Sequence, residues 1–437
     1  MWRNVRIGWL ISLVLLLALT PALAQDDTLT VQADADLEAA LGALADAFDG
    51  VTLEFVDADA DLLATTDLDA AREAAGGLPA HFLHEAALVA LTDDAAAQDF
   101  VRFAVSPDGQ QALIDGEFLP AVVTVTDQAG VEHEIAQPVY TLLSPYSVAT
   151  YLVYGVGGAD RLVGAGYLGA RDPLGAASME RIDPRFPELS GYALSQTDVN
   201  VEEVASLDPQ VVLTSTRSEW LDVIQSLDID VVVFEGESPE LLKESMLITG
   251  AILGPNTLAR AEAWVEYYDT VFADVVAVTS ELEADELVSV LFTGTNALRV
   301  ASGQMYQTDM IEAAGGVSVS AELGGFWNDV NLEQILLWQP DVIFVPPYGG
   351  ASVEAITDSS EWQILDAVQE DRVYLLPKLV APWDTPVPDS VLGIIWMANI
   401  LYPGLLDYDC EAEVTSFYQT FYDYEVTAEE LSRLCAS

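Results

Sequence analysis

The stretch NVEEVASLDPQVVL, residues 200–213, returns later in the chain as NLEQILLWQPDVIF, residues 331–344. In each copy an asparagine is suited to cap a helix, a glutamate lies in its first turn, a proline ends it, and an apolar run typical of a buried strand follows. These residues are Asn200, Glu202 and Pro209 in the first copy and Asn331, Glu333 and Pro340 in the second. Helix, proline and strand are common in α/β proteins, but here an asparagine, a glutamate and a proline match in register between the two copies. The sequence therefore predicts two α/β units of one design.

Charge limits the partners of this protein. The 437 residues include 71 acidic and 15 basic side chains, which gives a net charge of −56. Such a surface repels nucleic acid and anionic lipid headgroups, and we exclude both as partners. Because 51% of the residues are hydrophobic, packed cores are expected in place of disorder.

The first 24 residues have the pattern of a signal peptide. Arg3 and Arg6 precede an apolar run over residues 7–19, and Ala22-Leu23-Ala24 has the small-x-small form of a cleavage site. No cysteine stands near that site, so no lipid anchor is expected there. The sequence predicts an exported protein, periplasmic or extracellular and soluble after cleavage; an uncleaved membrane anchor is the alternative.

Residues 26–137 are predicted to form a small α/β module. The opening strand and helix, and the closing stretch AQDFVRFAVSPDGQQALIDGEFLPA over residues 97–121, resemble the two ends of the periplasmic molybdate-binding family. The middle of that family is missing, and Ala33-Asp34-Ala35-Asp36 stands where the family has hydroxyl residues. Carboxylates there would repel an oxyanion, so we expect a shortened structural or interaction module.

From Pro138 onward the pattern is strand, helix, strand in two halves. We predict an N-terminal lobe over residues 138–254, a linking helix over 255–284 and a C-terminal lobe over 285–437. The expected fold class is α/β: two Rossmann-like lobes joined by a single long helix and preceded by the small module.

The paired N-x-E helices, the single long helix and the ending WDTPVPDSVLGIIWMANILYP, residues 383–403, resemble the helical-backbone class of ABC-transporter solute-binding proteins. The resemblance covers residues 138–437. It implies a monomeric receptor that captures a metal chelate, of the iron-siderophore type or else haem or cobalamin, and delivers it to an ABC importer. It also implies that Glu202 and Glu333 dock onto the two copies of the permease, although both are equally favourable as first-turn glutamates.

A large chelate between the lobes needs aromatic faces and a few polar groups. We expect these on loops that follow strands. The candidates are Tyr146, Tyr167, Arg217, Trp220, Tyr306, Phe326, Trp327, Tyr348 and Trp383, with Arg171 and Arg299 as weaker alternatives to Arg217. Phe292, Trp338 and Trp396 are expected to be core residues.

Direct metal binding and catalysis are both disfavoured by the distribution of histidine. No histidine follows His133, so the two lobes lack the commonest base and transition-metal ligand. Ferric iron held by tyrosines and carboxylates stays open. We predict no enzyme activity, no metal site of the protein's own and no cofactor besides the chelate, a ferric complex or corrinoid. Cys410 and Cys435 are expected to form a disulfide in an oxidising compartment. An acidic cell-surface scaffold is the alternative of another class.

Overall fold

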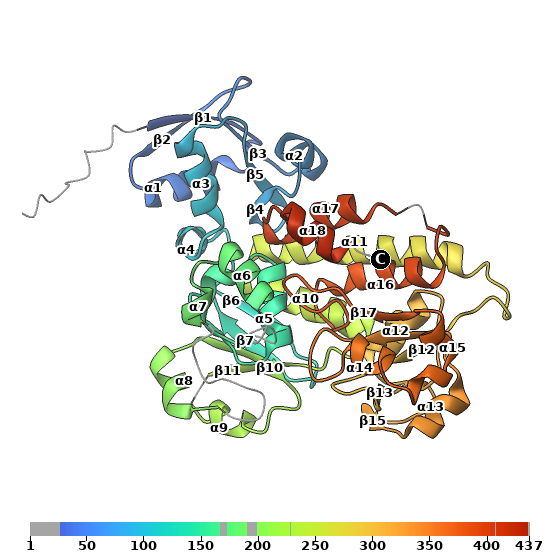
Figure 1. Ribbon diagram of the computed structural model, residues 1–437. Coiled ribbons are helices and arrows are strands. Elements are labelled where there is room, and N and C mark those ends of the chain that lie inside the picture. The colour runs from blue at the N-terminus through green and yellow to red at the C-terminus, as the bar shows by residue number, and fades with distance from the viewer. Residues whose placement is uncertain (1–26, 167–172, 190–198, 228, 407, 436–437) are drawn as a thin grey trace, which may run out of the picture.

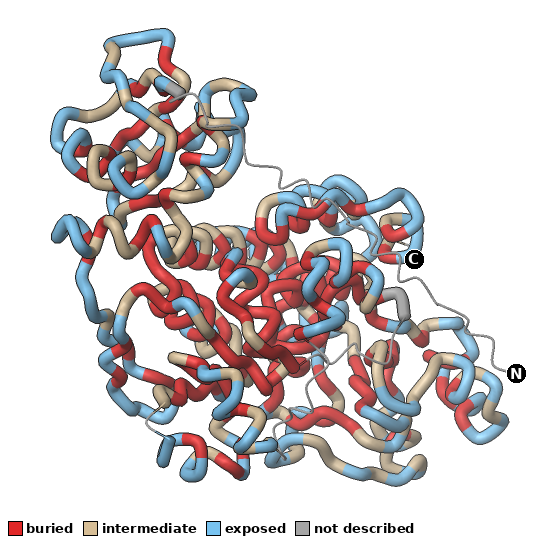
Figure 2. The backbone as a smooth tube through the Cα atoms, turned by 90° about the vertical axis from the view of Figure 1, so that its left-hand side faces the viewer, coloured by how far each residue is buried: buried red, intermediate tan, exposed pale blue. Residues whose placement is uncertain are grey.

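Three sheets of four or five strands follow one another in the computed structural model, which describes residues 27–166, 173–189, 199–227, 229–406 and 408–435 (Figure 1). The predicted fold class of two α/β lobes, a long helix and a preceding small module is confirmed. Figure 2 shows that buried residues run continuously through the two-lobed part, whereas the module has a smaller core of its own.

The N-terminal module has a mixed sheet in the order β2-β1-β3-β5-β4. Its strands are β1 (Asp27–Ala33), β2 (Val51–Phe55), β3 (Leu62–Thr65), β4 (Ala80–Leu83) and β5 (Ala86–Ala90), and its helices are α1 (Glu38–Ala47), α2 (Leu68–Ala75), α3 (Ala95–Val105) and α4 (Pro107–Asp115). Leu41, Leu62 and Phe100 are completely buried in its core.

A hairpin of β6 (Val122–Thr126) and β7 (Glu132–Ala136) joins this module to the next part. The side chains of Val125 and Ile135 enter the large core of the two-lobed part, not the core of the module. Alternating burial along β7 explains this, because one face of the hairpin needs an apolar neighbour.

The N-terminal lobe has a parallel sheet in the order β11-β10-β8-β9. Its strands are β8 (Leu142–Ser144), β9 (Leu162–Ala165), β10 (Val211–Ser215) and β11 (Asp230–Phe234); its helices are α5 (Ser147–Gly155), the 3-10 turn η1 (Ala159–Arg161), α6 (Pro173–Ile182), α7 (Phe186–Leu189), α8 (Val201–Leu207), α9 (Leu221–Gln225) and α10 (Pro239–Leu253). All five residues of β10 are buried, as a central parallel strand requires.

The C-terminal lobe has a second parallel sheet, in the order β14-β12-β16-β17. Its strands are β12 (Ser289–Phe292), β14 (Val317–Ser318), β16 (Val342–Val345) and β17 (Val373–Leu375), and β13 (Arg299–Ala301) pairs separately with β15 (Trp327–Asp329). Its helices are α12 (Tyr306–Ala313), α13 (Leu332–Trp338), α14 (Val353–Thr357), the 3-10 turn η3 (Trp362–Ile364), α15 (Asp366–Gln369), α16 (Ser390–Leu401), α17 (Cys410–Tyr422) and α18 (Ala428–Leu434).

The linking helix α11 (Pro255–Thr279) has 25 residues and so extends about 37 Å. Trp264 and Tyr268 on its buried face lie in the large core. It packs against α10 and α16, and therefore contacts both lobes.

The repeated units occupy equivalent places in the two sheets. Asn200 caps α8 by accepting hydrogen bonds from the amides of Glu202 and Glu203, and Asn331 caps α13 through the amide of Gln334. Each helix ends at a left-handed residue immediately before its proline. The strands that follow, β10 and β16, are interior strands of their sheets. The repeat predicted from the sequence is thus a structural repeat.

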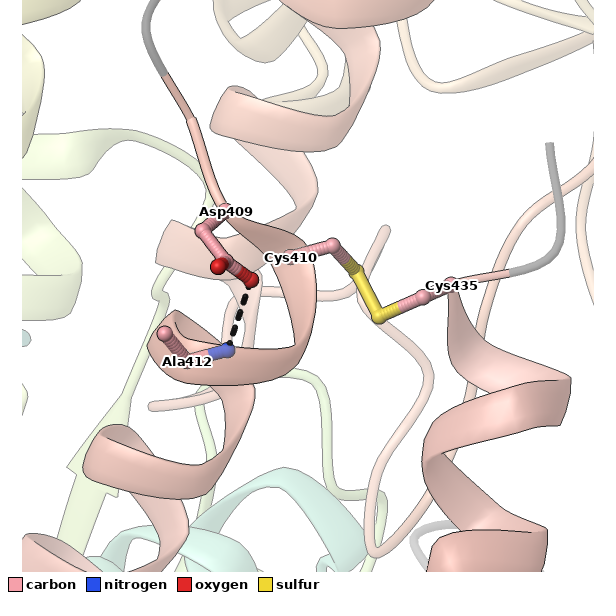
Figure 3. Close-up of a disulfide and its surroundings, with 4 residues drawn as sticks. All are labelled: Asp409, Cys410, Ala412 and Cys435. Carbon is pink, nitrogen blue, oxygen red and sulfur yellow. Dashed lines mark hydrogen bonds between the residues drawn. A yellow bond between two sulfur atoms is a disulfide. The ribbon is translucent and has the colours of Figure 1, made fainter.

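The last two helices return toward the N-terminal lobe. Helix α17 packs against α5, and Glu430 on α18 accepts a hydrogen bond of 2.7 Å from Ser178 on α6. Figure 3 shows Cys410 at the start of α17 joined by a disulfide to Cys435 at the end of α18, with a Cα separation of 5.8 Å. The tail is therefore tied to the body at both ends of α18.

Candidate functional site between the lobes

Arg217 connects the two lobes. It lies in the loop after β10 and donates a hydrogen bond of 2.9 Å to Glu237, which follows β11. Its guanidinium group lies 5.0 Å from the centre of the Phe326 ring in the other lobe. A guanidinium at this distance is attracted to the face of an aromatic ring. The carboxyl ends of the N-terminal sheet thus meet an exposed aromatic side chain of the C-terminal lobe.

Tyr146 lies beside this pair at the start of α5 and is 9% exposed. Burial raises the pKa of Tyr146 to about 12, with Arg217 opposing the rise and Glu237 adding to it. Burial lowers the pKa of Arg217, but the neighbouring Tyr146 and Glu237 outweigh it, and the net shift is upward. Tyr146 therefore keeps its proton and Arg217 its charge at neutral pH.

The C-terminal side of the site is built around Asp384. Its carboxylate accepts a hydrogen bond of 2.6 Å from Tyr348, and its main-chain carbonyl accepts one of 2.9 Å from Gln307. Asp384 is completely buried, and burial raises its pKa to about 6. Burial also raises the pKa of Tyr348, and the negative charges of Asp384 and Glu237 raise it further.

Further carboxylates lie where the two lobes approach each other. Burial raises the pKa of Asp309 on α12 to about 6, and the charges of Glu312, Glu240 and Glu237 raise it further. Glu237 and Glu240 belong to the N-terminal lobe, so acids of both lobes influence one another. The region carries more negative than positive charge.

Of the predicted ligand residues, the structure thus brings together Tyr146, Arg217, Phe326 and Tyr348. Trp327 is half-buried and belongs to β15, not to a loop as we expected. Tyr167 and the alternative Arg171 lie outside the described residues. Arg299 lies 3.7 Å from Asp329 at the surface of the C-terminal lobe.

Three predicted ligand residues are core residues in this structure. Tyr306 and Trp383 are completely buried, and their polar atoms are bonded internally: the Tyr306 hydroxyl to Tyr268 and Ser390, the Trp383 indole to Tyr418. Trp220 is 6% exposed and packs with apolar residues behind the N-terminal sheet. None of the three offers a surface to a ligand here. The expected core residues Phe292 and Trp396 are buried, and Trp338 is partly buried.

Glu237, Gln307 and Asp384 were missed by the sequence reasoning. Glu237 lies in the loop after the strand β11, as Arg217 lies in the loop after β10. Asp384 follows Trp383, and nothing local distinguishes this carboxylate from the many other acidic residues of the chain. Gln307 lies on a helix and carries no signal in the sequence.

The two glutamates of the repeat, Glu202 and Glu333, are exposed in the first turns of α8 and α13. They stand on corresponding helices of separate lobes.

In the N-terminal module, hydrogen-bond donors at the carboxyl end of strand β3 are bonded to the carboxylate of Asp34, which follows strand β1. Its Oδ2 accepts hydrogen bonds from the Thr65 hydroxyl at 3.0 Å and from the amide and hydroxyl of Thr66 at 2.7 and 3.0 Å. The amide of Thr66 is the largest of the effects that lower the Asp34 pKa. These donors are occupied by the protein's own anion.

Among the described residues, no group of three His, Cys, Asp or Glu side chains is arranged to hold a metal ion. No helix in the same ranges combines the length and apolar character needed to cross a membrane.

Comparison with known proteins places this geometry in a family. The sequence profile described as periplasmic binding protein matches residues 151–379, just over half of the chain. The molybdate-binding protein MolA of Haemophilus influenzae is 28% identical over 260 residues, which cover 54% of this chain and 74% of MolA.

Solved structures agree. A periplasmic solute-binding protein from Veillonella parvula superposes with a TM-score of 0.63 at 26% identity, covering 72% of this chain and 96% of that one. Helicobacter pylori CeuE with Ni(II) bound shares the fold, with a TM-score of 0.60 at 17% identity and coverage of 71% and 98%. The family implies export from the cytoplasm. The chain belongs to the periplasmic binding protein family and is a solute-binding protein of the ABC-transporter class.

Proposed function

We propose that the protein binds a metal chelate between its two lobes and delivers it to the permease dimer of an ABC importer. The contact between Arg217 and Phe326 carries the proposal, because it puts a cation and an exposed aromatic face from different lobes at one place. Tyr146 and Tyr348 add hydroxyl groups that remain protonated at neutral pH. The function involves no catalytic step.

Molybdate is the second candidate, since MolA is named for binding it. An oxyanion needs donors that are not already neutralised by acids. Here Arg217 is paired with Glu237, and Glu240, Asp309 and Asp384 add negative charge nearby. This charge balance favours a neutral or cationic complex over a free oxyanion. Among chelates it favours a corrinoid, or a siderophore complex with little net negative charge.

The domain division is part of the proposal: a module over residues 26–137, lobes over 138–254 and 285–437, and the linking segment 255–284. We assign the module a structural role. It is attached through hydrogen bonds from the His81 amide to Asn256 at 3.0 Å and from Gln110 to the carbonyl of Leu253 at 3.1 Å. Asp34 already occupies the donors at the strand ends of the module, which argues against an oxyanion site at that place.

The test is a calorimetric titration of the exported chain with ferric siderophores, cobalamin, haem, free ferric ion and molybdate. We expect saturable binding of one chelate, weakened at least about tenfold by Arg217→Gln and by Phe326→Ala. Arg299→Gln, which removes a surface arginine of the C-terminal lobe, is the matched control and should leave the affinity unchanged.

Tryptophan fluorescence adds a positional readout. Trp327→Phe should remove most of the quenching by the ligand, whereas replacing the buried Trp220 or Trp383 by Phe should remove little. Tight binding of molybdate alone would replace the chelate by the second candidate. No binding by any member of the panel would shift the assignment toward an acidic scaffold protein.

A further inference from the structure

A groove of about 600 Å³ lies on the C-terminal lobe, apart from the contact between Arg217 and Phe326. Its walls are the loop after β16, the edge strand β17 with the residues that follow it, and the end of α18. Trp396 on α16 forms part of its floor. Among the ligand residues predicted from the sequence, Tyr348 alone reaches it, with its ring in the groove and its hydroxyl on Asp384. The volume is in the range of small-molecule sites.

The charge of this groove is opposite to that of the whole molecule. Its described lining residues include two cations, Lys378 and Arg433, and no carboxylate. The chain as a whole has 71 acidic residues against 15 basic ones. Lys378 is buried, and its charge is among the effects that oppose the rise in the pKa of Asp384. Arg433 is exposed at the rim.

Another groove of the protein lacks this excess of positive over negative side chains. That groove, of about 690 Å³, lies where the N-terminal module meets α11 and α17, and it also contains arginines. There, however, Arg161 pairs with Asp160, and Arg185 pairs with Asp183. Arginines in that groove hold neighbouring main-chain carbonyls, such as that of Val105, and serve the packing of the module. Its lining is balanced in charge, so it does not attract an anion.

Aromatic rings shape the groove on the C-terminal lobe. The rings of Tyr374 and Trp396 meet edge to face, with centres 6.4 Å apart and an angle of 85° between their planes. Phe344 lies behind both, 5.6 Å from Trp396. Together with Tyr348 and the prolines Pro346 and Pro347, these groups give flat apolar walls that suit a planar ligand.

The wall that carries Arg433 is held in place. The disulfide between Cys410 and Cys435 begins two residues beyond Arg433, and Glu430 one turn earlier is bonded to Ser178 and to the hydroxyl of Tyr424. Arg433 is therefore presented from a helix anchored at both ends. Such preorganisation lowers the entropic cost of binding.

We propose that this groove is a second ligand site, for a planar aromatic molecule that carries a carboxylate or another single anionic group. The ring lies against Tyr374, Trp396 and Tyr348, and the anion faces Arg433 and Lys378. This second site shares Tyr348 with the site between the lobes but does not include Tyr146, Arg217 or Phe326, and the charge balance between the lobes disfavours anions.

Calorimetric titration of the whole exported chain with 2-naphthoate tests the proposal. We expect saturable binding of one naphthoate per chain, at least about tenfold weaker in Arg433→Gln, because a charged hydrogen bond is lost. The neutral 2-naphthamide should bind the unchanged protein about tenfold more weakly than naphthoate. Arg372→Gln removes a charge of the same lobe outside the groove, and it should not alter the affinity.

Three results would overturn the proposal: no saturable naphthoate binding at millimolar concentration, equal affinity in Arg433→Gln, or equal affinity for naphthamide. Loss of naphthoate binding in Arg217→Gln, with retention in Arg433→Gln, would place the ligand between the lobes and likewise contradict it. Because Arg433 is exposed, the melting temperature of Arg433→Gln should match that of the unchanged protein, which separates loss of binding from loss of fold.

Discussion

Asp389 is a carboxyl group enclosed in the protein core. It is completely buried and accepts hydrogen bonds from the hydroxyl of Tyr418 at 2.5 Å and from the hydroxyl of Tyr422. Burial raises its pKa from 3.8 to about 6, against the opposing effect of these hydrogen bonds. Since no arginine or lysine is among the causes of this shift, the cost of burying its charge is offset by the two tyrosine hydroxyls and by main-chain amides such as that of Ala381.

This environment predicts an unusual dependence of stability on pH. The folded-state pKa lies above the unfolded value, so the folded protein binds the proton more tightly. The stabilisation is complete below pH 3.8 and is lost as the pH rises through 6. The loss from Asp389 amounts to about 3 kcal/mol.

Asp389→Asn removes the titration while keeping the shape of the side chain. The free energy of unfolding of this variant, relative to the unchanged protein, should therefore rise by about 3 kcal/mol between pH 3.5 and 7.5. Urea unfolding at a series of pH values measures this difference, and the other carboxyl groups cancel because both proteins have them. A difference that does not vary with pH would show that Asp389 titrates normally.

The repeated helix and strand units allow a prediction about how much their helix caps contribute to stability. Asn200 and Asn331 each cap a seven-residue helix through amide hydrogen bonds. Replacing either by alanine should cost about 1 kcal/mol of unfolding free energy. Because the two caps lie in different lobes, the double variant should lose the sum.

Asn→Asp at the same positions is the matched control. An aspartate keeps the acceptor oxygen and suits the helix dipole, so it should restore most of the lost stability. Denaturant unfolding of the six single and double variants tests this. A large excess of the double-variant loss over the sum would mean that the units are coupled through the structure, and the idea of two independent units would then be wrong.

Elements were predictable from the sequence because their signals are local. Ser238 followed by Pro239 is typical of a helix start, and the structure has the helix α10 at Pro239–Leu253, capped by Ser238. The surroundings of single aromatics were not predictable in this way. Tyr306 and Trp383 follow loop-like sequences, but their burial is decided by α11, α16 and α17, which come from other parts of the chain. Trp327 was expected in a loop, and its pairing with Ala301 makes it part of a strand.

The arrangement of the candidate site likewise depends on contacts between distant parts of the chain. Arg217 and Phe326 were each predicted as ligand residues, but a contact between them was not predicted. That Phe326 meets Arg217 depends on how the lobes are held by α11, which no local pattern encodes. Likewise the hairpin β6–β7 was assigned to the module by its position in sequence, whereas its apolar residues pack with the N-terminal lobe.

In the molecule as a whole, we expect the continuous helix α11 to limit the movement of the two lobes relative to each other. A single helix of 25 residues that packs against α10 and α16 has no hinge loop of its own. Opening of the lobes must then come from small shifts at their contact, of the kind made by packed helices. We therefore expect the two lobes to keep nearly the same separation with and without a ligand, as contact with two fixed points on a partner would require.

We expect the protein to dock to the permease through one exposed glutamate on each lobe. Glu202 and Glu333 are exposed on α8 and α13, one in each lobe. Replacing both by alanine should abolish ligand uptake by vesicles that contain the cognate permease, because the charge contacts on both subunits are lost together. Ligand affinity, measured by calorimetry, should not change, since neither residue lies at the site between the lobes.

Asp222 and Glu354 supply a matched control for that experiment. They too are exposed carboxylates in the first turns of short helices, α9 and α14, and again there is one in each lobe. Their double replacement by alanine removes the same total charge. If the positions of the glutamates decide docking, uptake by this control should continue at the original rate. If net charge alone decides docking, uptake should fall as much as in the Glu202 and Glu333 double variant. Single variants separate the lobes: a permease that is two-fold symmetric should lose a comparable share of uptake with Glu202→Ala and with Glu333→Ala. Uptake that survives the Glu202 and Glu333 double replacement would refute the docking assignment, and both residues would then be only favourable first-turn glutamates.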